Sequence, residues 1–577
     1  MTIATYKPTL EQAAIIGHQG HAFVRACPGA GKTRTMVERA RVVLADRTDR
    51  RSVAFLSFTN AAVDELTSRL AMFSALPTPL FPNFIGTFDR FLWQFLIAPF
   101  GVEGCVVAPR LVPDKKDWVV KPPYDKAQAL TLECFDRQTG LLIQAKADDV
   151  AFTPKNGPGA WETAARNIIA RSFAEGRLDF DDVRACVRKR LADKIFAARV
   201  GAALAGRFRE IVVDEAQDCN PTDLEIIAWL RASGLTVKII CDPNQGIYGF
   251  RGGVVGELDV FAGTFDRSDH LPMNGNFRSS PAICAAISQL RPPASRGKPD
   301  QALGRYKDET TPVHLLSYGG KAVSPTIGPA FLALVEGLGI EPKDAPVLAS
   351  TWSSASSAAG RRAVDVASDK TLLLAQSVLD FLSAFKAGNR REALGRLHRA
   401  VLVTRGHIAH AGDYGTHLTK PECEGGGWRP EIIAIGRALQ PTTGQPADQW
   451  LARARVLLDR DLVGTSTINQ RLRNNAELGS VLATGHATDP PARSIHAVKG
   501  LEFSAVCVVL SPQTAGKILD VLTGVSTSPK LVEDARKVYV ASSRAERLLA
   551  IATPKSRVTA LKGLLEAGGM PVAVSEI

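Results

Sequence analysis

The sequence predicts an α/β fold with parallel sheets, and three observations lead to this prediction. First, a short apolar segment, HAFVRA, precedes the glycine loop CPGAGKT, and TRTMVERARVVLA follows it with apolar residues at helical spacing. Second, EIVVDEAQD opens with a β-branched run typical of a buried parallel strand and ends in carboxylates. Third, the chain has 577 residues, which at about 150 residues per domain exceeds one ordinary core. Several compact parts are therefore expected.

The composition restricts the class of protein less than the motifs do. Lys and Arg number 70 against 58 Asp and Glu, and the net charge of +12 permits a polyanionic partner. A generally basic cytosolic enzyme explains this charge as well. The nine cysteines form no CxxC pair, which argues against a zinc or iron–sulfur site and fits a reducing compartment. Since no apolar run suits a signal peptide or a membrane span, a cytoplasmic protein without a membrane partner is expected.

The glycine loop has the residue types of a phosphate-binding loop. Gly29 and Gly31 let backbone N–H groups approach phosphates, and the start of the following helix favours negative charge. Lys32 can reach the β- and γ-phosphates, and Thr33 can offer its hydroxyl to Mg²⁺. A glycine-rich turn that happens to contain Lys-Thr is the alternative, and the flanking strand and helix favour nucleotide binding. The predicted binding residues here are Ala26, Pro28, Gly29, Ala30, Gly31, Lys32, Thr33 and Arg34.

The second half of such a site is a buried strand that ends in a carboxylate. Asp214 stands at the carboxyl end of the run IVV, where α/β sheets bind ligands. It is the predicted Mg²⁺ ligand together with Thr33, and Glu215 beside it is the predicted catalytic residue that polarises the attacking water. A surface acidic turn is the alternative, and the loop upstream makes it the weaker one. This pair indicates nucleotide hydrolysis.

Seven further segments occur in one order along the chain. They are TLEQAAI, VAFLSFTNAAVDEL, FIGTFDRF, CDPNQGIYGFRGG, NGNFRSS, SIHAVKGLEFSAVCVV and EDARKVYVASSRAERLLAIA. With DEAQD, this ordered set resembles the motifs of superfamily 1 DNA helicases of the UvrD/Rep/PcrA type, from residue 12 to about residue 550. The resemblance implies two RecA-like P-loop lobes with parallel sheets, each interrupted by a mainly helical insert.

The resemblance also implies the remaining residues of an ATP site between the lobes. Arg278 and Arg544 would bring positive charge to the γ-phosphate when the lobes close, and Gln245 would sense that phosphate. Lys32 and Glu215 complete this catalytic set. Gln12 would read adenine, Phe277 and Arg34 would sandwich it, and Glu502 would bind the ribose. An arginine on a helix surface is the alternative for Arg544.

DNA contacts should combine aromatic stacking with polar groups that follow the backbone. The residues carried over by resemblance are Phe58, Thr59, Asn60, Thr87, Phe88, Tyr248, Phe250, Arg251 and His496. Aromatic residues in such segments are also common in cores. The family commonly has Trp where Phe250 stands and His where Asp89 stands, so a smaller stacking surface and an added negative charge are expected.

The motifs divide the chain into six segments. The first lobe comprises 1–92 and 180–272, with its insert at 93–179; the second comprises 273–360 and 491–577, with its insert at 361–490. About thirty residues follow the last motif, which leaves no room for a nuclease domain. Any nuclease is therefore expected to act in trans.

Three functions are compatible with these motifs. The main hypothesis is an ATP- and Mg²⁺-dependent 3′→5′ single-stranded DNA translocase and helicase that engages single-stranded DNA and junctions with duplex. The second is a DNA-sensing ATPase subunit that activates a partner nuclease, as in anti-phage defence systems such as Gabija. An RNA motor is the third, although DEAQD with YGFRG looks more like the DNA branch. Repair, replication restart and defence all stay open as pathways.

Overall fold

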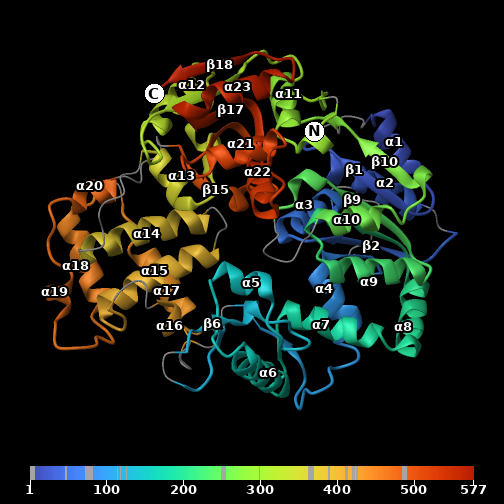
Figure 1. Ribbon diagram of the computed structural model, residues 1–577, viewed down its shortest axis with the longest axis horizontal. Helices are drawn as coiled ribbons and strands as arrows, with labels where there is room; N and C mark the ends of the chain where they lie inside the picture. Colours follow the sequence, from blue (N-terminus) through green and yellow to red (C-terminus); the bar gives the residue numbers. More distant parts are fainter. Residues whose placement is uncertain are drawn as a thin grey trace. The chain divides into compact units, whose positions relative to one another are not determined.

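The structure is a computed structural model that divides into two compact units, each treated separately below (Figure 1). Unit 1 comprises Met1–Thr87, Val200–Ala363 and Gly485–Ile577, and unit 2 comprises Phe88–Arg199 and Val364–Thr484. The described residues are 7–45, 48–71, 82–112, 115–116, 118–124, 127–247, 255–297, 299–360, 369–386, 390–409, 414–418, 423, 426–442, 444–483 and 490–577.

The first sheet of unit 1 has six parallel strands in the order β10-β1-β9-β8-β2-β3. Its strands are β1 (Ala22–Ala26), β2 (Ser52–Ser57), β3 (Phe84–Thr87), β8 (Phe208–Val213), β9 (Thr236–Cys241) and β10 (His270–Met273). The associated helices are α1 (Leu10–Gly17), α2 (Lys32–Ala45), α3 (Asn60–Ala71), α8 (Lys194–Arg207), α9 (Pro221–Ala232) and α10 (Val255–Ala262). Apolar side chains of α1, α2 and α3 pack on β1, β2 and β8 in one core.

The second sheet of unit 1 also has six parallel strands, in the order β15-β14-β16-β17-β13-β18. Its strands are β13 (Val313–Tyr318), β14 (Val347–Ala349), β15 (Ala492–Ser494), β16 (Phe503–Val509), β17 (Ala545–Pro554) and β18 (Val572–Glu576). A short parallel pair, β11 (Gly275–Asn276) and β12 (Gln301–Ala302), lies outside this sheet. The helices associated with the second sheet are α11 (Pro281–Gln289), α12 (Ile327–Gly337), α13 (Trp352–Ala358), α21 (Ala515–Leu522), α22 (Pro529–Ser542) and α23 (Val558–Glu566).

Helices cover both faces of the second sheet, which explains why its strands are almost continuously apolar. Leu315 and Val508 belong to a core with α11, α21, α22 and α23, whereas their neighbours Leu316 and Cys507 belong to a core with α12 and α13. Side chains alternate between the faces of a strand, so both faces must be apolar where both are covered. The predicted α/β class with two RecA-like lobes is confirmed.

In unit 2, the first insert begins with α4 (Phe88–Leu92) and the π-helical turn η1 (Trp93–Ile97). It continues with β4 (Arg110–Leu111), β5 (Val119–Val120), β6 (Leu130–Thr131), α5 (Gln144–Asp149), α6 (Gly159–Ala174), β7 (Arg177–Leu178) and α7 (Phe180–Leu191). Because α7 packs against α4 and η1, the compact unit includes residues 180–199, which the motif order assigned to the first lobe.

A buried ionic cluster holds the first insert together. Lys115 is fully buried, and its ammonium pairs with Asp182 and donates to Ser172 Oγ at 2.7 Å. The backbone N–H of Lys115 donates to Asp179 at 2.9 Å, and Arg137 bridges both aspartates. Burial, followed by the charge of Asp179, raises the pKa of Asp182 to about 6. The cluster therefore depends on every charge keeping its partner.

Replacing Lys115 with methionine is expected to lower the free energy of unfolding of the first insert by about 3 kcal/mol, because the buried carboxylate of Asp182 loses its ammonium partner. Protection of the amides of α6 and α7 in hydrogen exchange measures this loss. The exposed Lys194→Met variant is the control and should change protection little. Unchanged protection in Lys115→Met would contradict a stabilising role for the cluster.

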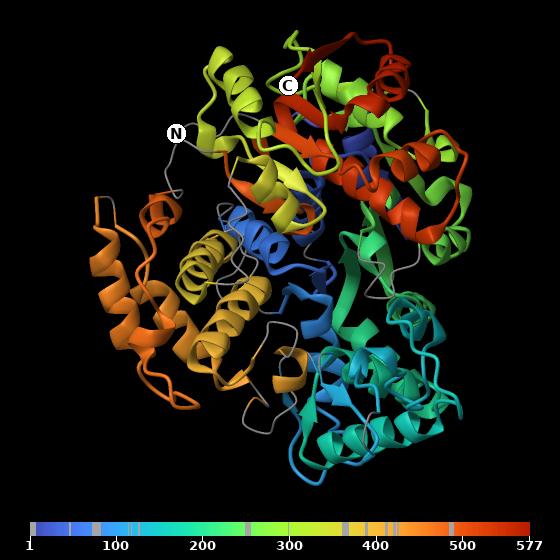
Figure 2. The same ribbon diagram turned by 60° about the vertical axis from the view of Figure 1, so that its left-hand side comes forward.

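The regular secondary structure of the second insert is helical in its described part. Its helices are α14 (Lys370–Lys386), α15 (Arg390–Arg405), α16 (Tyr414–His417), α17 (Arg429–Ala438), α18 (Ala447–Leu458), α19 (Ile468–Arg471) and α20 (Leu478–Ala483). Figures 1 and 2 show α14 and α15 side by side. Their core includes Phe381, Leu397 and the fully buried Trp450. Among the helices that the structure describes, none is long and apolar enough to cross a membrane.

Candidate nucleotide site

The glycine loop joins β1 to α2, the context that the sequence predicted. Gly29 has φ +69° and Gly31 has φ +76°, a backbone region that side chains disfavour. A Cβ on Gly29 would lie 2.5 Å from Oδ1 of Asn276 and 2.6 Å from Cβ of Arg278. Glycine is therefore required here for two reasons: the backbone conformation, and the close approach of a segment from the second lobe.

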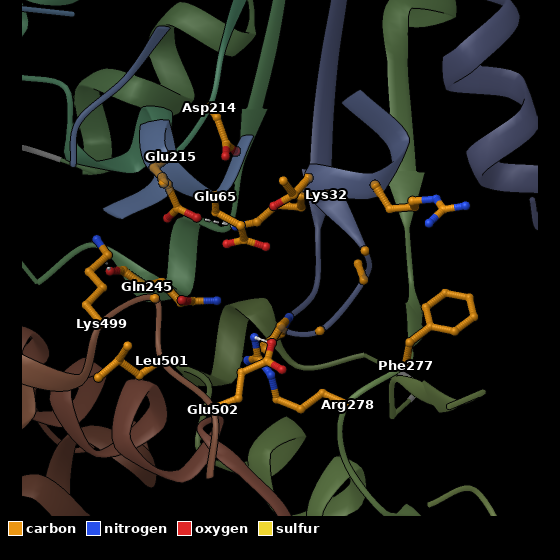
Figure 3. A pocket seen from close by; sticks show the side chains of 18 of the residues that line it. Lys32, Glu65, Asp214, Glu215, Gln245, Phe277, Arg278, Lys499, Leu501 and Glu502 are labelled. Carbon is orange, nitrogen blue, oxygen red and sulfur yellow. Dashed lines mark hydrogen bonds and ion pairs between the residues drawn. The ribbon is translucent and has the colours of Figure 1, made fainter. Parts of the chain in front are cut away.

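A cavity of about 380 Å³ lies against this loop, a size typical of small-molecule sites (Figure 3). Both lobes of unit 1 line it. The lining residues are Pro28, Gly29, Ala30, Gly31, Lys32, Thr33, Arg34, Thr59, Ala62, Glu65, Arg69, Asp214, Glu215, Gln245, Phe277, Arg278, Lys499, Gly500, Leu501, Glu502 and Arg544. All five predicted catalytic residues thus lie around one cavity, as do the two predicted metal ligands.

The carboxylate pair lies at the carboxyl end of β8. Glu215 adopts φ +56°, and its side chain accepts a hydrogen bond from Lys32 Nζ at 2.7 Å (Figure 3). Burial raises the pKa of Glu215, but the positive charges of Lys32 and Lys499 outweigh burial and hold that pKa below its usual value. Burial and then the charge of Glu215 raise the pKa of Asp214. The two neighbouring carboxyl groups therefore differ in proton affinity, and Glu215 is the one kept ionised.

The residues present fit a divalent cation. Oδ1 of Asp214 is buried and has no hydrogen-bond partner among the residues that the structure describes. An unsatisfied carboxylate oxygen in a buried polar cavity is costly unless a cation or water occupies its vicinity. Thr33 lines the same cavity, and a carboxylate with a hydroxyl suits Mg²⁺.

The second lobe contributes two arginines that are held in defined positions. Arg278 pairs with Glu502 and donates to the carbonyl of Ser543 at 2.9 Å (Figure 3). Arg544 is buried, and its guanidinium donates to Oε1 of Gln245 at 2.7 Å. Gln245 follows β9 of the first lobe, so this bond joins the two lobes at the cavity. The alternative of a helix-surface arginine does not hold for Arg544.

Sequence reasoning missed three charged residues of the cavity wall. Lys499 pairs with both carboxylate oxygens of Asp218, at 2.6 and 2.5 Å, and both side chains are buried. Glu65 and Arg69 form an ion pair of 2.7 Å on α3. Lys499 stands three residues before Glu502, and Glu65 and Arg69 share one face of α3 with Ala62, which also lines the cavity. That spacing was the available signal.

Of the predicted adenine-binding residues, Phe277 and Arg34 line the cavity, whereas Gln12 lies outside its lining. Gln12 is buried, accepts from the backbone N–H of Thr9 at 3.1 Å and donates to the carbonyl of Ala30 at 3.0 Å. The Phe277 side chain is 37% exposed and lines the cavity, which leaves part of its ring accessible for stacking on a base (Figure 3). Arg34 pairs with Glu38 at 3.4 Å on α2. The sandwich of adenine by Phe277 and Arg34 stays a prediction.

The residues predicted to contact DNA differ from one another in their exposure to solvent. Phe58, Thr87 and His496 are partly exposed and Asn60 is exposed, whereas Thr59 lies on the wall of the cavity. The sequence prediction for Phe88 needs correction, because its ring is fully buried and offers no face for stacking. Tyr248, Phe250 and Arg251 lie outside the described residues.

The negative charge of Asp89, which differs from the family pattern, is compensated within unit 2. Its carboxylate pairs with Arg184 at 2.5 Å. The expected added negative charge is therefore largely neutralised by α7.

Two RecA-like lobes around a phosphate loop, a carboxylate strand and arginines from the second lobe define a P-loop nucleotide hydrolase of the two-lobed type. Residues 8–266 match the family of the UvrD/REP helicase N-terminal domain. Together with the relatives below, this match supports a UvrD/Rep-type superfamily 1 helicase, so the predicted family is confirmed.

Three relatives illustrate the similarity. The chain is 24% identical to "ATP-dependent DNA helicase UvrD2" of Mycobacterium tuberculosis, over 95% of this chain and 78% of that protein. It is 25% identical to "DNA helicase II" of Escherichia coli, over 48% of this chain and 39% of that protein. It is 30% identical to "RecBCD enzyme subunit RecB" of Mycolicibacterium smegmatis, over 24% of this chain and 13% of that protein.

Proposed function

We propose that this protein is an ATP-dependent 3′→5′ single-stranded DNA translocase and helicase. The observation that carries the proposal is the cavity lined by both lobes, in which Lys32 of the first lobe lies in the same space as Arg278 and Arg544 of the second. A triphosphate bound in this cavity would attract the positively charged side chains of both lobes. Nucleotide binding and hydrolysis would then change the closure of the lobes, which a motor requires.

The positively charged side chains are engaged with protein groups, and ATP would replace those partners. Lys32 is paired with Glu215, and Arg278 is paired with Glu502. On binding, the γ-phosphate takes the place of Glu215 beside Lys32, which leaves this carboxylate ionised and able to orient the attacking water. Glu502 would correspondingly be released toward the ribose.

Gln245 would relay the state of the γ-phosphate to the second lobe. Its amide nitrogen donates to Asp242 at 2.8 Å, and its amide oxygen accepts from Arg544. Loss of the phosphate would remove negative charge beside this bond and favour reopening. Bound Mg²⁺, held by Asp214 and Thr33, would supply positive charge at the β- and γ-phosphates.

Single-stranded DNA is the proposed track, with contacts from residues at the carboxyl ends of strands. Phe58, Asn60 and Thr87 follow or end β2 and β3, and His496 follows β15. Helix α3 begins at Asn60 and continues to Glu65 and Arg69 on the cavity wall, so DNA and nucleotide would act on the two ends of one helix. The relatives named as DNA helicases support DNA as the nucleic acid. We place this activity in the cytoplasm.

The test is ATP hydrolysis by the purified chain with and without single-stranded DNA, followed by unwinding of duplexes with a 3′ or a 5′ tail. We expect at least about tenfold stimulation by DNA and unwinding of the 3′-tailed duplex alone. The Lys32→Ala variant is the inactive control, because the loop then has no lysine for the phosphates.

Two results would count against the autonomous motor. Unwinding from the 5′ tail would reverse the proposed polarity. ATP binding without DNA-stimulated turnover would instead favour the alternative of a DNA-sensing subunit that activates a nuclease in defence or repair. No contact in the structure favours that alternative among the described residues.

A further inference from the structure

Helix α1 holds the segment that connects the two lobes through Glu11, a residue outside the cavity. The two carboxylate oxygens of Glu11 accept from the backbone N–H of Asn274 at 2.7 Å and from its side-chain amide at 3.0 Å. Glu11 is half-buried and Asn274 is exposed. Two charge-assisted bonds to one residue fix the direction as well as the distance of the segment.

The segment that Glu11 holds leads directly to the adenine and phosphate ends of the cavity. Asn274 follows β10, the last strand of the first lobe. Three residues later, Phe277 donates its backbone N–H to the carbonyl of Gly29 at 2.8 Å, and Asn276 Oδ1 accepts from the backbone N–H of Arg278 at 2.8 Å. Glu11 and Gly29 thus anchor the two ends of a four-residue stretch on the first lobe.

The anchors differ in how much freedom they leave to the segment. The Gly29 anchor is a single backbone bond in a place where a Cβ would collide with Asn276 and Arg278. The Glu11 anchor consists of side-chain bonds, and Glu11 is next to Gln12, the residue expected to read adenine. A shift of α1 on adenine binding would therefore be passed through Glu11 to Asn274.

We infer that Glu11 is a positioning residue of the nucleotide site, which acts through Asn274 to place Phe277 for stacking on adenine and Arg278 for the γ-phosphate. The inference rests on the proposed function in taking the cavity as an ATP site. Neither Glu11 nor Asn274 lines the cavity, so neither is a catalytic residue.

Glu11 also lies in the first turn of α1, where a negative charge stabilises a helix. This general effect must be separated from the bond to Asn274. The Asn274→Ala variant removes the side-chain bond and leaves the charge on α1 unchanged. Glu257→Ala is the matched control, because Glu257 is an exposed acid in the first turn of α10, another helix of eight residues.

The experiment measures the dissociation constant of a non-hydrolysable ATP analogue in the Glu11→Ala, Asn274→Ala and double variants. Glu11→Ala removes both bonds and is expected to bind the analogue about fivefold more weakly, whereas Asn274→Ala keeps the backbone bond and should lose less. The double variant should bind no more than about twofold more weakly than Glu11→Ala, because the bond lost in Asn274→Ala is already lost there. The dissociation constant for single-stranded DNA should change less than about twofold in all of them, unlike after general destabilisation.

Affinity within about twofold of wild type in both single variants, or effects that multiply in the double variant, would overturn the inference. An equal loss in Glu257→Ala would do so too. The readout needs no hydrolysis, so it separates this inference from the proposed function. Weakened binding of the analogue by a chain without DNA-stimulated turnover would support the positioning role and refute the motor.

Discussion

The Glu215→Gln variant is expected to hydrolyse ATP about a thousandfold more slowly than wild type in the presence of single-stranded DNA, while it still binds ATP. The carboxylate is ionised, accepts from Lys32 at 2.7 Å and lies on the wall of the cavity. A glutamine has the same shape but cannot take a proton from water. Its neutral amide also leaves Lys32 free for the phosphates, so ATP affinity should be equal or higher.

Steady-state ATP turnover and equilibrium ATP binding, measured on the same preparation, test this expectation. The exposed Glu336→Gln variant on α12 removes a charge of the same sign outside the cavity lining and should keep wild-type turnover. Turnover of Glu215→Gln within about tenfold of wild type would show that another group orients the water. Loss of ATP binding as well would indicate a structural role for the carboxylate.

Local patterns predicted the parts of the site that depend on chain-adjacent residues. The glycine loop and Lys32 lie between β1 and α2, and Asp214 and Glu215 follow β8, because strand, loop and helix are specified within a few residues. Arg278, Arg544 and Glu502 were placed by resemblance, and the structure brings all three to the same cavity. Their roles in catalysis and binding stay predictions.

The sequence patterns could not predict contacts between segments that are distant in the chain. Lys499 and Asp218 are 281 positions apart in the chain, and only the packing of the lobes makes them an ion pair. An aromatic residue such as Phe88 suits a core and a stacking site equally, and the structure shows that its ring is buried in the core. The buried cluster around Lys115 was equally invisible, because lysine is usually exposed.

The Arg544→Ala variant is expected to lower ATP turnover about a thousandfold, with a smaller loss of ATP affinity, because this arginine would stabilise charge that develops on the γ-phosphate. Its guanidinium is already held at the cavity by Gln245 Oε1 and by the carbonyl of Val540 at 3.1 Å. Burial and then the charge of Arg278 lower the pKa of Arg544, so the site stabilises an added negative charge between them. Lysine at this position should not restore turnover, since an ammonium lacks the planar fork that reaches two partners.

Arg547 offers a matched control for this variant. It lies three residues further along on β17, pairs with Glu309 at 3.1 Å and does not line the cavity. Arg547→Ala should retain turnover within about twofold, since it removes a partly exposed ion pair. Thermal unfolding of both variants separates loss of the buried Arg544 contacts from loss of chemistry. Arg544→Ala could instead keep its fold and turn over ATP within about tenfold of wild type. In that case Arg278 and Lys32 alone would stabilise the charge on the γ-phosphate. Closure of the lobes through the bond between Arg544 and Gln245 would then not be required for hydrolysis.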